Sequence, residues 1–316
     1  MNKLIYELGD TTKKLFKAPF TIKSYAMLGE RLLLKKRHQC SAPQLFIMGL
    51  PRSGTTLAYQ YIAHRLNVSY FTYGVGNFPH APCLITFIQH KIHGQYQSNF
   101  ESNYGKESGL ISPVAPREAG GWWCRFFHLN NYVTVDDLTE KDIHVLQNTI
   151  ACIQNVFGGT PFVNKNVKHL LRIGILGKIF PNSRFLIVER DIPDVAMSIL
   201  RARYKNLSDA TQWWSVRPPN YKKLKDLPIA EQITNQCTSL KQKMESDLSK
   251  LPHDRVMRIH YEYFCNNPEG FIRKIAFFIN ATITKNPAQQ RFKVSHGHPQ
   301  NHEESKLIEL VGKLSQ

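Results

Sequence analysis

Short apolar runs alternate along this chain with longer segments whose apolar residues have helical spacing. Four segments have the length of a strand, at residues 45–48, 161–165, 184–188 and 256–260. Helical spacing is found at residues 56–66, 136–157, 168–180, 193–204, 228–250 and 268–279. Such alternation is typical of a parallel sheet with helices on both faces. The pattern therefore predicts an α/β fold with a central parallel sheet flanked by helices.

Three regions depart from this alternation. Residues 1–40 predict one or two amphipathic helices with a basic end, which serve either as a packing arm or as a docking segment for an anionic membrane. Residues 70–121 are irregular and rich in Gly, Pro, Asn and aromatic residues, as in loops that face a substrate. Residues 281–303 are polar and predict a loop. We expect a single domain over 1–316, with an acceptor-binding cap at 70–135.

Charge and cysteine content narrow the partners and the compartment. Lys and Arg total 41 against 24 Asp and Glu, a formal net charge of +17, which suits nucleic acid, an anionic membrane or a polyanionic small ligand. No apolar run is long enough to span a bilayer, and the first residues do not resemble a secretory signal. Six scattered cysteines without a C-x-x-C pair fit a reducing interior. We therefore expect a cytoplasmic protein, with peripheral membrane contact as the alternative.

The segment that follows the first apolar run, Gly-Leu-Pro-Arg-Ser-Gly-Thr-Thr at 49–56, has the glycine spacing of a phosphate-binding loop. Thr55 occupies the place of the usual lysine. The backbone N–H groups and the start of the next helix still form an anion cradle, to which Arg52 adds charge. No acidic residue at the end of a predicted strand is a convincing ligand for Mg²⁺. The loop therefore predicts a single phosphate held without metal.

A second phosphate-binding element follows the run at 184–188. Arg190 comes at the end of this predicted strand, and Ser198 lies about two turns into the following helix. The guanidinium fork and the hydroxyl can converge on one phosphate. Alone this pair would be weak evidence, because an arginine there often forms a structural ion pair. The pair becomes informative because the loop at 49–56 predicts a phosphate site as well.

Together these segments resemble the sulfotransferases that use 3′-phosphoadenosine-5′-phosphosulfate (PAPS). The similarity covers PRSGTT at 51–56, the segment FPNSRFLIVERDIPDVAMSI and, as support, RVMRIHYEYFCNNPEGFIRKIAFFI at 255–279. It implies a P-loop NTPase-like fold, sulfuryl transfer to a hydroxyl and no metal, with a small molecule, carbohydrate or glycolipid as acceptor. Arg190 and Ser198 would bind the 3′-phosphate. The residues implied for the 5′-phosphosulfate are Arg52, Ser53, Gly54, Thr55 and Thr56.

The catalytic residues are less clearly marked. The resemblance implies that Lys165 stabilises charge near the sulfuryl group, with Lys168 as its competitor. For the general base we favour Glu118, whose alternative role is an ion pair with Arg117, and His80 is the second candidate. The neighbouring aromatic cluster either lines the acceptor site or belongs to the core; it comprises Trp122, Trp123, Phe126 and Phe127.

Two other functions compete with sulfuryl transfer. A P-loop-type nucleotide or small-molecule kinase would need Mg²⁺-ATP, and Thr55 in place of lysine argues against it. A basic nucleic-acid-binding protein would explain the net charge, but no RNA- or DNA-binding motif is present. The late segment RFKVSHGHPQNHEES contains three histidines at 296, 298 and 302 that could bind a metal, although no fourth ligand is placed. Arg291 and Lys293 lie where the family often brings a basic loop over the 3′-phosphate.

Overall fold

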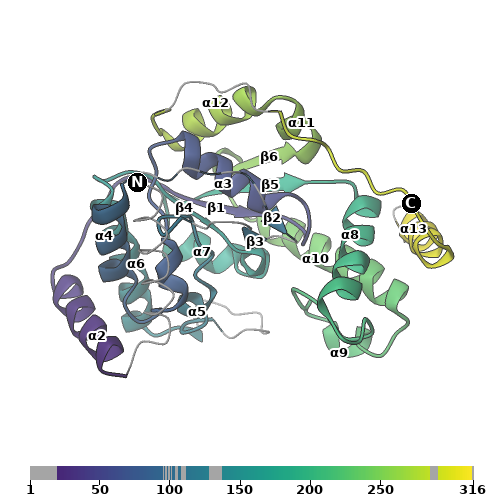
Figure 1. Cartoon of the computed structure of the whole chain (residues 1–316), viewed down its shortest axis with the longest axis horizontal. Helices are drawn as coiled ribbons and strands as arrows, with labels where there is room; N and C mark the ends of the chain where they lie inside the picture. The colour runs from purple at the N-terminus through teal and green to yellow at the C-terminus, as the bar shows by residue number, and fades with distance from the viewer. Residues whose placement is uncertain are drawn as a thin grey trace, which may run out of the picture.

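The computed structural model describes residues 20–94, 96, 98, 100, 102–103, 106–107, 112–127, 137–284 and 291–314. Its centre is a four-stranded sheet in the order β4-β1-β5-β6, in which every neighbouring pair is parallel (Figure 1). The strands are β1 (Gln44–Met48), β4 (Phe162–Lys165), β5 (Arg184–Glu189) and β6 (Val256–His260). A small antiparallel pair is formed by β2 (Ser102–Asn103) and β3 (Lys106–Glu107). The predicted α/β fold is confirmed.

Alternation of side chains along β1 creates two cores. Leu45 and Ile47 face one cluster, which contains residues of α3 (Thr55–Arg65), α11 (Tyr261–Asn266) and α12 (Pro268–Ile279). Phe46 and Met48 face the other, which contains residues of α6 (Glu140–Val156), α7 (Ile173–Ile179) and α10 (Ile229–Leu248). Both faces of the sheet are therefore covered, which explains why all five residues of β1 are buried.

The remaining helices extend the layers sideways. At one edge of the molecule, α2 (Phe20–Lys35) packs beside α4 (Pro82–His93) (Figure 1). At the opposite edge, α8 (Ile192–Asn206) and α10 pack with α13 (His302–Leu314) through a third apolar cluster. The short helices are η1 (Tyr73–Gly76), α5 (Gly120–Trp123), η3 (Val167–Leu171), α9 (Tyr221–Leu224) and η4 (His253–Arg255).

Several boundaries differ from the expectation. The region 70–121 was predicted to be irregular, yet it contains α4, whose first turn Pro82 begins and whose backbone N–H groups of Cys83 and Leu84 donate to the Glu30 carboxylate. The helix expected at 168–180 is instead the short helix η3 followed by α7. The polar tail is extended at 291–301 and then forms α13.

The predicted N-terminal arm and cap are described only in part. Residues 1–19 of the arm lie outside the described residues, as do 128–136 and parts of 95–111 in the cap. All six cysteines are free, and four of them are buried. Among the described residues, no helix is both long enough and apolar enough to cross a bilayer.

Candidate active site

The loop after β1 is held in a conformation that two glycines permit. A side chain at Gly49 would overlap the Val188 carbonyl and the Ser53 hydroxyl. Gly54, the N-cap of α3, has a φ of 93°, and a side chain there would overlap the Tyr261 ring. Arg52 also has a positive φ, of 74°. The loop therefore presents its backbone and the start of an eleven-residue helix at one end of the sheet.

Parallel pairing brings the other predicted elements to the same end. Lys165 is the last residue of β4 and pairs with Ile47 of β1. Arg190 directly follows β5 on the other side of β1, and Tyr261 follows β6. Because the carboxyl ends of parallel strands share one edge, residues more than a hundred positions apart in sequence meet there.

A cavity of about 500 Å³ opens at this edge. The predicted site residues that line it are Arg52, Gly54, Thr55, Thr56, Glu118, Lys165, Arg190 and Ser198. Ser53 instead lines a second cavity of about 200 Å³, and its buried hydroxyl has no hydrogen-bond partner among the described residues. His80 and Lys168 are not among the residues that line the 500 Å³ cavity. His80 is exposed in the turn before α4, and partial desolvation together with the charge of Arg125 lowers its pKa.

The two predicted phosphate elements are hydrogen-bonded to each other. Arg52 Nε donates to Ser198 Oγ at 3.0 Å, and Arg190 Nη1 donates to the Arg52 carbonyl at 3.0 Å. The Arg190 guanidinium also lies over the Tyr261 ring at 5.0 Å. Its side chain is 8% exposed, so the cation is held in place rather than free in solvent. Arg52, Arg190 and Ser198 thus line one wall of the cavity, and the Asp194 carboxylate lies 3.9 Å from Arg190 Nη2.

Glu118 and Lys165 form an ion pair on the cavity wall. The Lys165 side chain is 5% exposed and that of Glu118 is 39% exposed, so solvent reaches the pair from the carboxylate side. The alternative pairing of Glu118 with Arg117 is wrong, because the Arg117 guanidinium lies over the Tyr73 ring at 4.5 Å. The Arg117 carbonyl accepts a hydrogen bond from Asn164 Nδ2 at 3.2 Å, which fastens the loop to β4 beside Lys165.

The aromatic cluster after Glu118 belongs mainly to the core. Trp122, Trp123 and Phe127 are fully buried, and Trp123 Nε1 donates to Asn164 Oδ1 at 3.0 Å. The acceptor-lining alternative is therefore wrong for these three residues. The aromatic residues that line the cavity are Phe100, Trp214, Tyr261 and Phe292. Of these, only Tyr261 lies in a segment that carried the family resemblance.

The C-terminal strap, defined here as residues 291–314, closes another side of the cavity. Phe292, Lys293 and Ser295 line it, and the Ser295 carbonyl accepts a hydrogen bond from Arg190 Nη2. Of the two basic residues predicted on this late loop, Lys293 lines the cavity and Arg291 does not. Asp194 fastens the next residues, since its carboxylate accepts from Gly297 N at 2.7 Å and lies 3.2 Å from His296 Nδ1.

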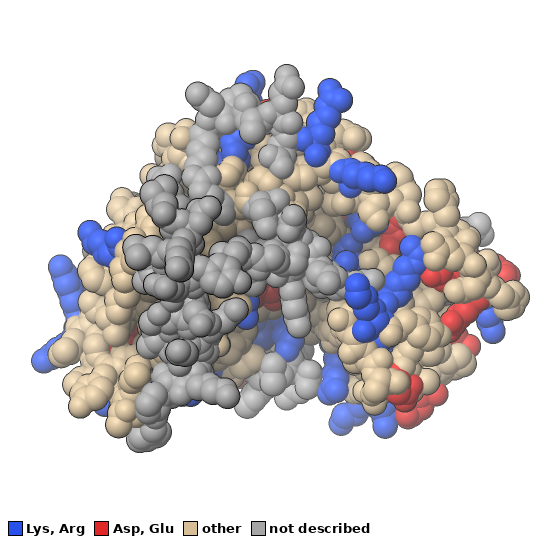
Figure 2. All heavy atoms as spheres, viewed as in Figure 1, with Lys and Arg blue, Asp and Glu red and all other residues tan. Residues whose placement is uncertain are grey.

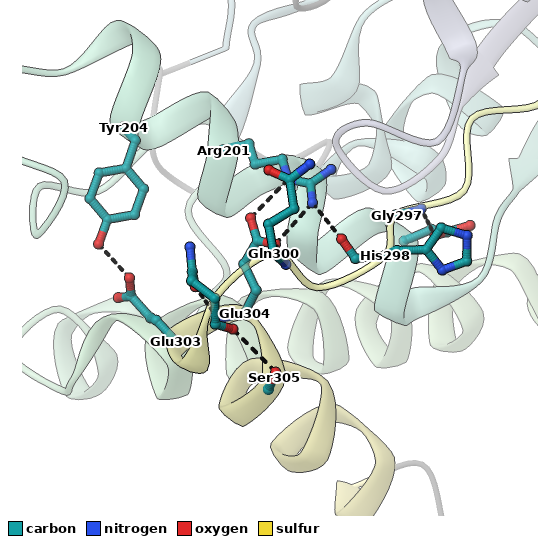
Figure 3. Close-up of polar contacts among 10 residues, drawn as sticks. Arg201, Tyr204, Gly297, His298, Gln300, Glu303, Glu304 and Ser305 are labelled. Carbon is teal, nitrogen blue, oxygen red and sulfur yellow. Dashed lines mark hydrogen bonds and ion pairs between the residues drawn. The ribbon is translucent and has the colours of Figure 1, made fainter.

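Helix α8 holds the rest of the strap through two polar side chains (Figure 3). Arg201 donates to the His298 carbonyl at 2.8 Å and to both carboxylate oxygens of Glu304 at 2.8 and 2.9 Å. Tyr204 donates to Glu303 at 2.6 Å. Arg201 holds the pKa of Glu304 below its usual range. The same helix that supplies Ser198 to the cavity therefore also anchors the strap.

The three late histidines are not assembled into a metal site. His296 contacts Asp194, while His298 contributes its backbone carbonyl to Arg201. Across the described part of the chain, no group of three or more His, Cys, Asp or Glu side chains is placed to hold a metal ion.

Comparisons with known proteins point to one family. A family model described as the sulfotransferase family matches residues 43–285. The chain resembles the sulfotransferase STF1 from Mycobacterium tuberculosis H37Rv with a TM-score of 0.50 and 12% identity, over 90% of this chain and 77% of that one. A sulfotransferase from Alicyclobacillus acidocaldarius has a TM-score of 0.47 and 12% identity, over 87% and 96% of the two chains. No curated protein matches the chain significantly.

The structural likeness to STF1 supports the fold, and the family model carries the assignment. The match to the family model begins just before β1 and ends after α12. It therefore includes both predicted phosphate-binding elements and spans well over half of the chain. Of the three functions that the sequence suggested, it favours sulfuryl transfer over the kinase and the nucleic-acid binder. The chain belongs to the sulfotransferase family.

Proposed function

We propose that this protein transfers the sulfuryl group of PAPS to a hydroxyl group of a carbohydrate or glycolipid acceptor. The observation that carries the proposal is the contact between the two phosphate elements. Arg52 of the loop hydrogen-bonds Ser198 of α8, and Arg190 hydrogen-bonds the loop backbone, all on one cavity wall. Two anion-binding elements in one cavity suit a donor with phosphate groups at both ends of its ribose.

The charge of the cavity supports an anionic donor. Its lining includes four cationic side chains and one carboxylate; the cations are Arg52, Lys165, Arg190 and Lys293. In such a site, Gly54, Thr55 and Thr56 would hold the 5′-phosphosulfate with backbone N–H groups and hydroxyls. Arg190 and Ser198 would hold the 3′-phosphate. Ser53 would act by shaping the loop, because its hydroxyl is buried away from the 500 Å³ cavity.

Glu118 and Lys165 are proposed to carry the chemistry. The acceptor oxygen forms a bond to sulfur as the bond between sulfur and the bridging phosphate oxygen breaks. Glu118, on the solvent-reached side of the pair, takes the proton from the acceptor hydroxyl. Lys165 neutralises the negative charge that develops on the bridging oxygen, and 3′,5′-ADP leaves. Both side chains lie on the wall of one cavity, so positioning contributes as well.

The acceptor class rests on the aromatic lining. Phe100, Trp214 and Phe292 present ring surfaces to the cavity, and such surfaces stack on the apolar face of a sugar as well as on adenine. All six cysteines are free, which is typical of a protein in a reducing compartment. We therefore propose the cytoplasm as its location.

A donor-binding and transfer assay tests the proposal. The purified protein should bind 3′,5′-ADP in titration calorimetry without added metal, and should move label from [³⁵S]PAPS to a glycan or glycolipid in an acceptor panel. Activity should persist in EDTA. Failure to bind either PAPS or 3′,5′-ADP would overturn the donor assignment. Transfer to acceptors outside the carbohydrate class would overturn the acceptor assignment alone.

A further inference from the structure

Helix α2 carries a row of apolar side chains on its exposed side. Ile22, Tyr25, Leu28 and Leu32 follow one another at intervals of three or four residues, which places them on one helix face. Tyr25 is 74% exposed, Leu28 54% and Leu32 66%. Scattered exposed leucines are ordinary in a protein surface, but a row along one helix marks a docking face.

Helix α4 adds to this surface. The two helices approach closely, because Gly29 of α2 leaves room for the Leu84 side chain of α4. On α4, Ile88 is 41% exposed and Ile92 is 63% exposed. Glu30 fixes the relative position of the helices through its hydrogen bonds to the start of α4. The apolar side chains therefore stand on two helices that are fastened to each other.

The charged residues that α2, α4 and their adjoining segments expose have one sign. Residues 20–43 and 80–94 contain six Lys or Arg residues, at 23, 31, 35, 36, 37 and 91, and all six are exposed. Their only acidic residue is Glu30, which is buried and bonded to α4. Figure 2 shows Lys and Arg side chains at the edge of the molecule where Figure 1 places the two helices.

We propose that the exposed face of α2 and α4 binds an anionic membrane surface. Apolar side chains flanked by Lys and Arg suit the boundary between acyl chains and negatively charged headgroups. A second copy of this chain would bring a face of the same charge against it. Residues 1–19 contain four lysines and two acidic residues, so their net charge does not complement the face either. An anionic bilayer complements both the apolar row and the charge. The docking does not depend on the transfer reaction.

Vesicle binding by the full chain tests this inference. The protein should sediment with vesicles of phosphatidylglycerol and phosphatidylcholine, and much less with phosphatidylcholine alone or at high salt. Arg31→Gln with Lys35→Gln should weaken binding by about 25-fold, from about fivefold for each basic residue near the surface. Leu32→Ser should weaken it by about tenfold. The matched control is Phe277→Ser, because Phe277 is 91% exposed on α12.

The affinity for 3′,5′-ADP should stay unchanged in all these variants, which separates this inference from the proposed function. Absence of binding to anionic vesicles by the full chain would overturn it. So would equal weakening by Phe277→Ser. A dimer that Leu28→Ser with Leu32→Ser dissociates, without vesicle binding, would identify a second copy as the occupant.

Discussion

Replacement of Glu118 by Gln tests the assignment of the base, because it removes the charge and keeps the side-chain shape. Removing one partner of a fully buried ion pair costs about 3–5 kcal/mol. Here the Glu118 side chain is 39% exposed, and the Gln carbonyl would still accept a hydrogen bond from Lys165. We therefore expect a stability loss of only about 1 kcal/mol, which corresponds to a fall in Tm of about 2 °C.

The effect on the rate should be much larger. Loss of a general base lowers kcat by about 10²- to 10⁴-fold, equivalent to about 3–5 kcal/mol in the activation free energy. A loss of 1 kcal/mol in stability leaves the protein folded at the assay temperature, so it cannot produce this decrease. We therefore expect a large decrease in kcat together with only a small decrease in Tm.

The assay compares initial rates of label transfer, Tm and 3′,5′-ADP affinity for the two proteins. The matched control is Glu231→Gln, an exposed carboxylate on α10, which should change none of the three. A Glu118→Gln variant with kcat within about threefold of the parent would refute the role of Glu118 as the base. An equal loss of kcat and of ADP affinity would refute it too, because Glu118 would then serve the binding site through Lys165.

Three further predictions concern the donor cavity and its strap. Arg190→Ala should weaken 3′,5′-ADP binding by about 100-fold in calorimetry, since it removes charged hydrogen bonds to phosphate. Gly54→Ala should abolish that binding and lower Tm, because the methyl group would overlap the Tyr261 ring at a backbone φ of 93°; unchanged binding would contradict the proposed loop conformation. Arg201 lowers the pKa of Glu304, so the stability that this pair adds should be complete above about pH 4.5 and be lost as pH falls through the lowered pKa. Proteolysis of the strap against pH should show this, and Arg201→Gln should remove the pH dependence.

The regular part of the fold could be predicted because local pattern and tertiary packing agree there. The strands β1 and β5 are short, mostly apolar segments, and α6 begins at a capping box between Thr139 and Asp142. Helices α4 and α13 were missed for different reasons. In α4 the start is stabilised by Glu30, more than fifty residues away in the sequence. In α13 the charged residues Glu303 and Glu304 are paired with α8, which its own sequence does not reveal.

By itself, the sequence determined the elements whose chemistry is local: the glycine loop at 49–56, and an arginine placed directly after a strand. Their backbone requirements are met within a few residues, so the pattern is visible in the chain. Only the tertiary structure decided which side chains face the cavity. Parallel pairing brought Lys165 beside the loop. Close packing buried Trp122 and Trp123 in the core rather than leaving them at the cavity. These outcomes depend on contacts between distant segments of the chain. Such contacts determine which apolar side chains are buried and which charged side chains are paired.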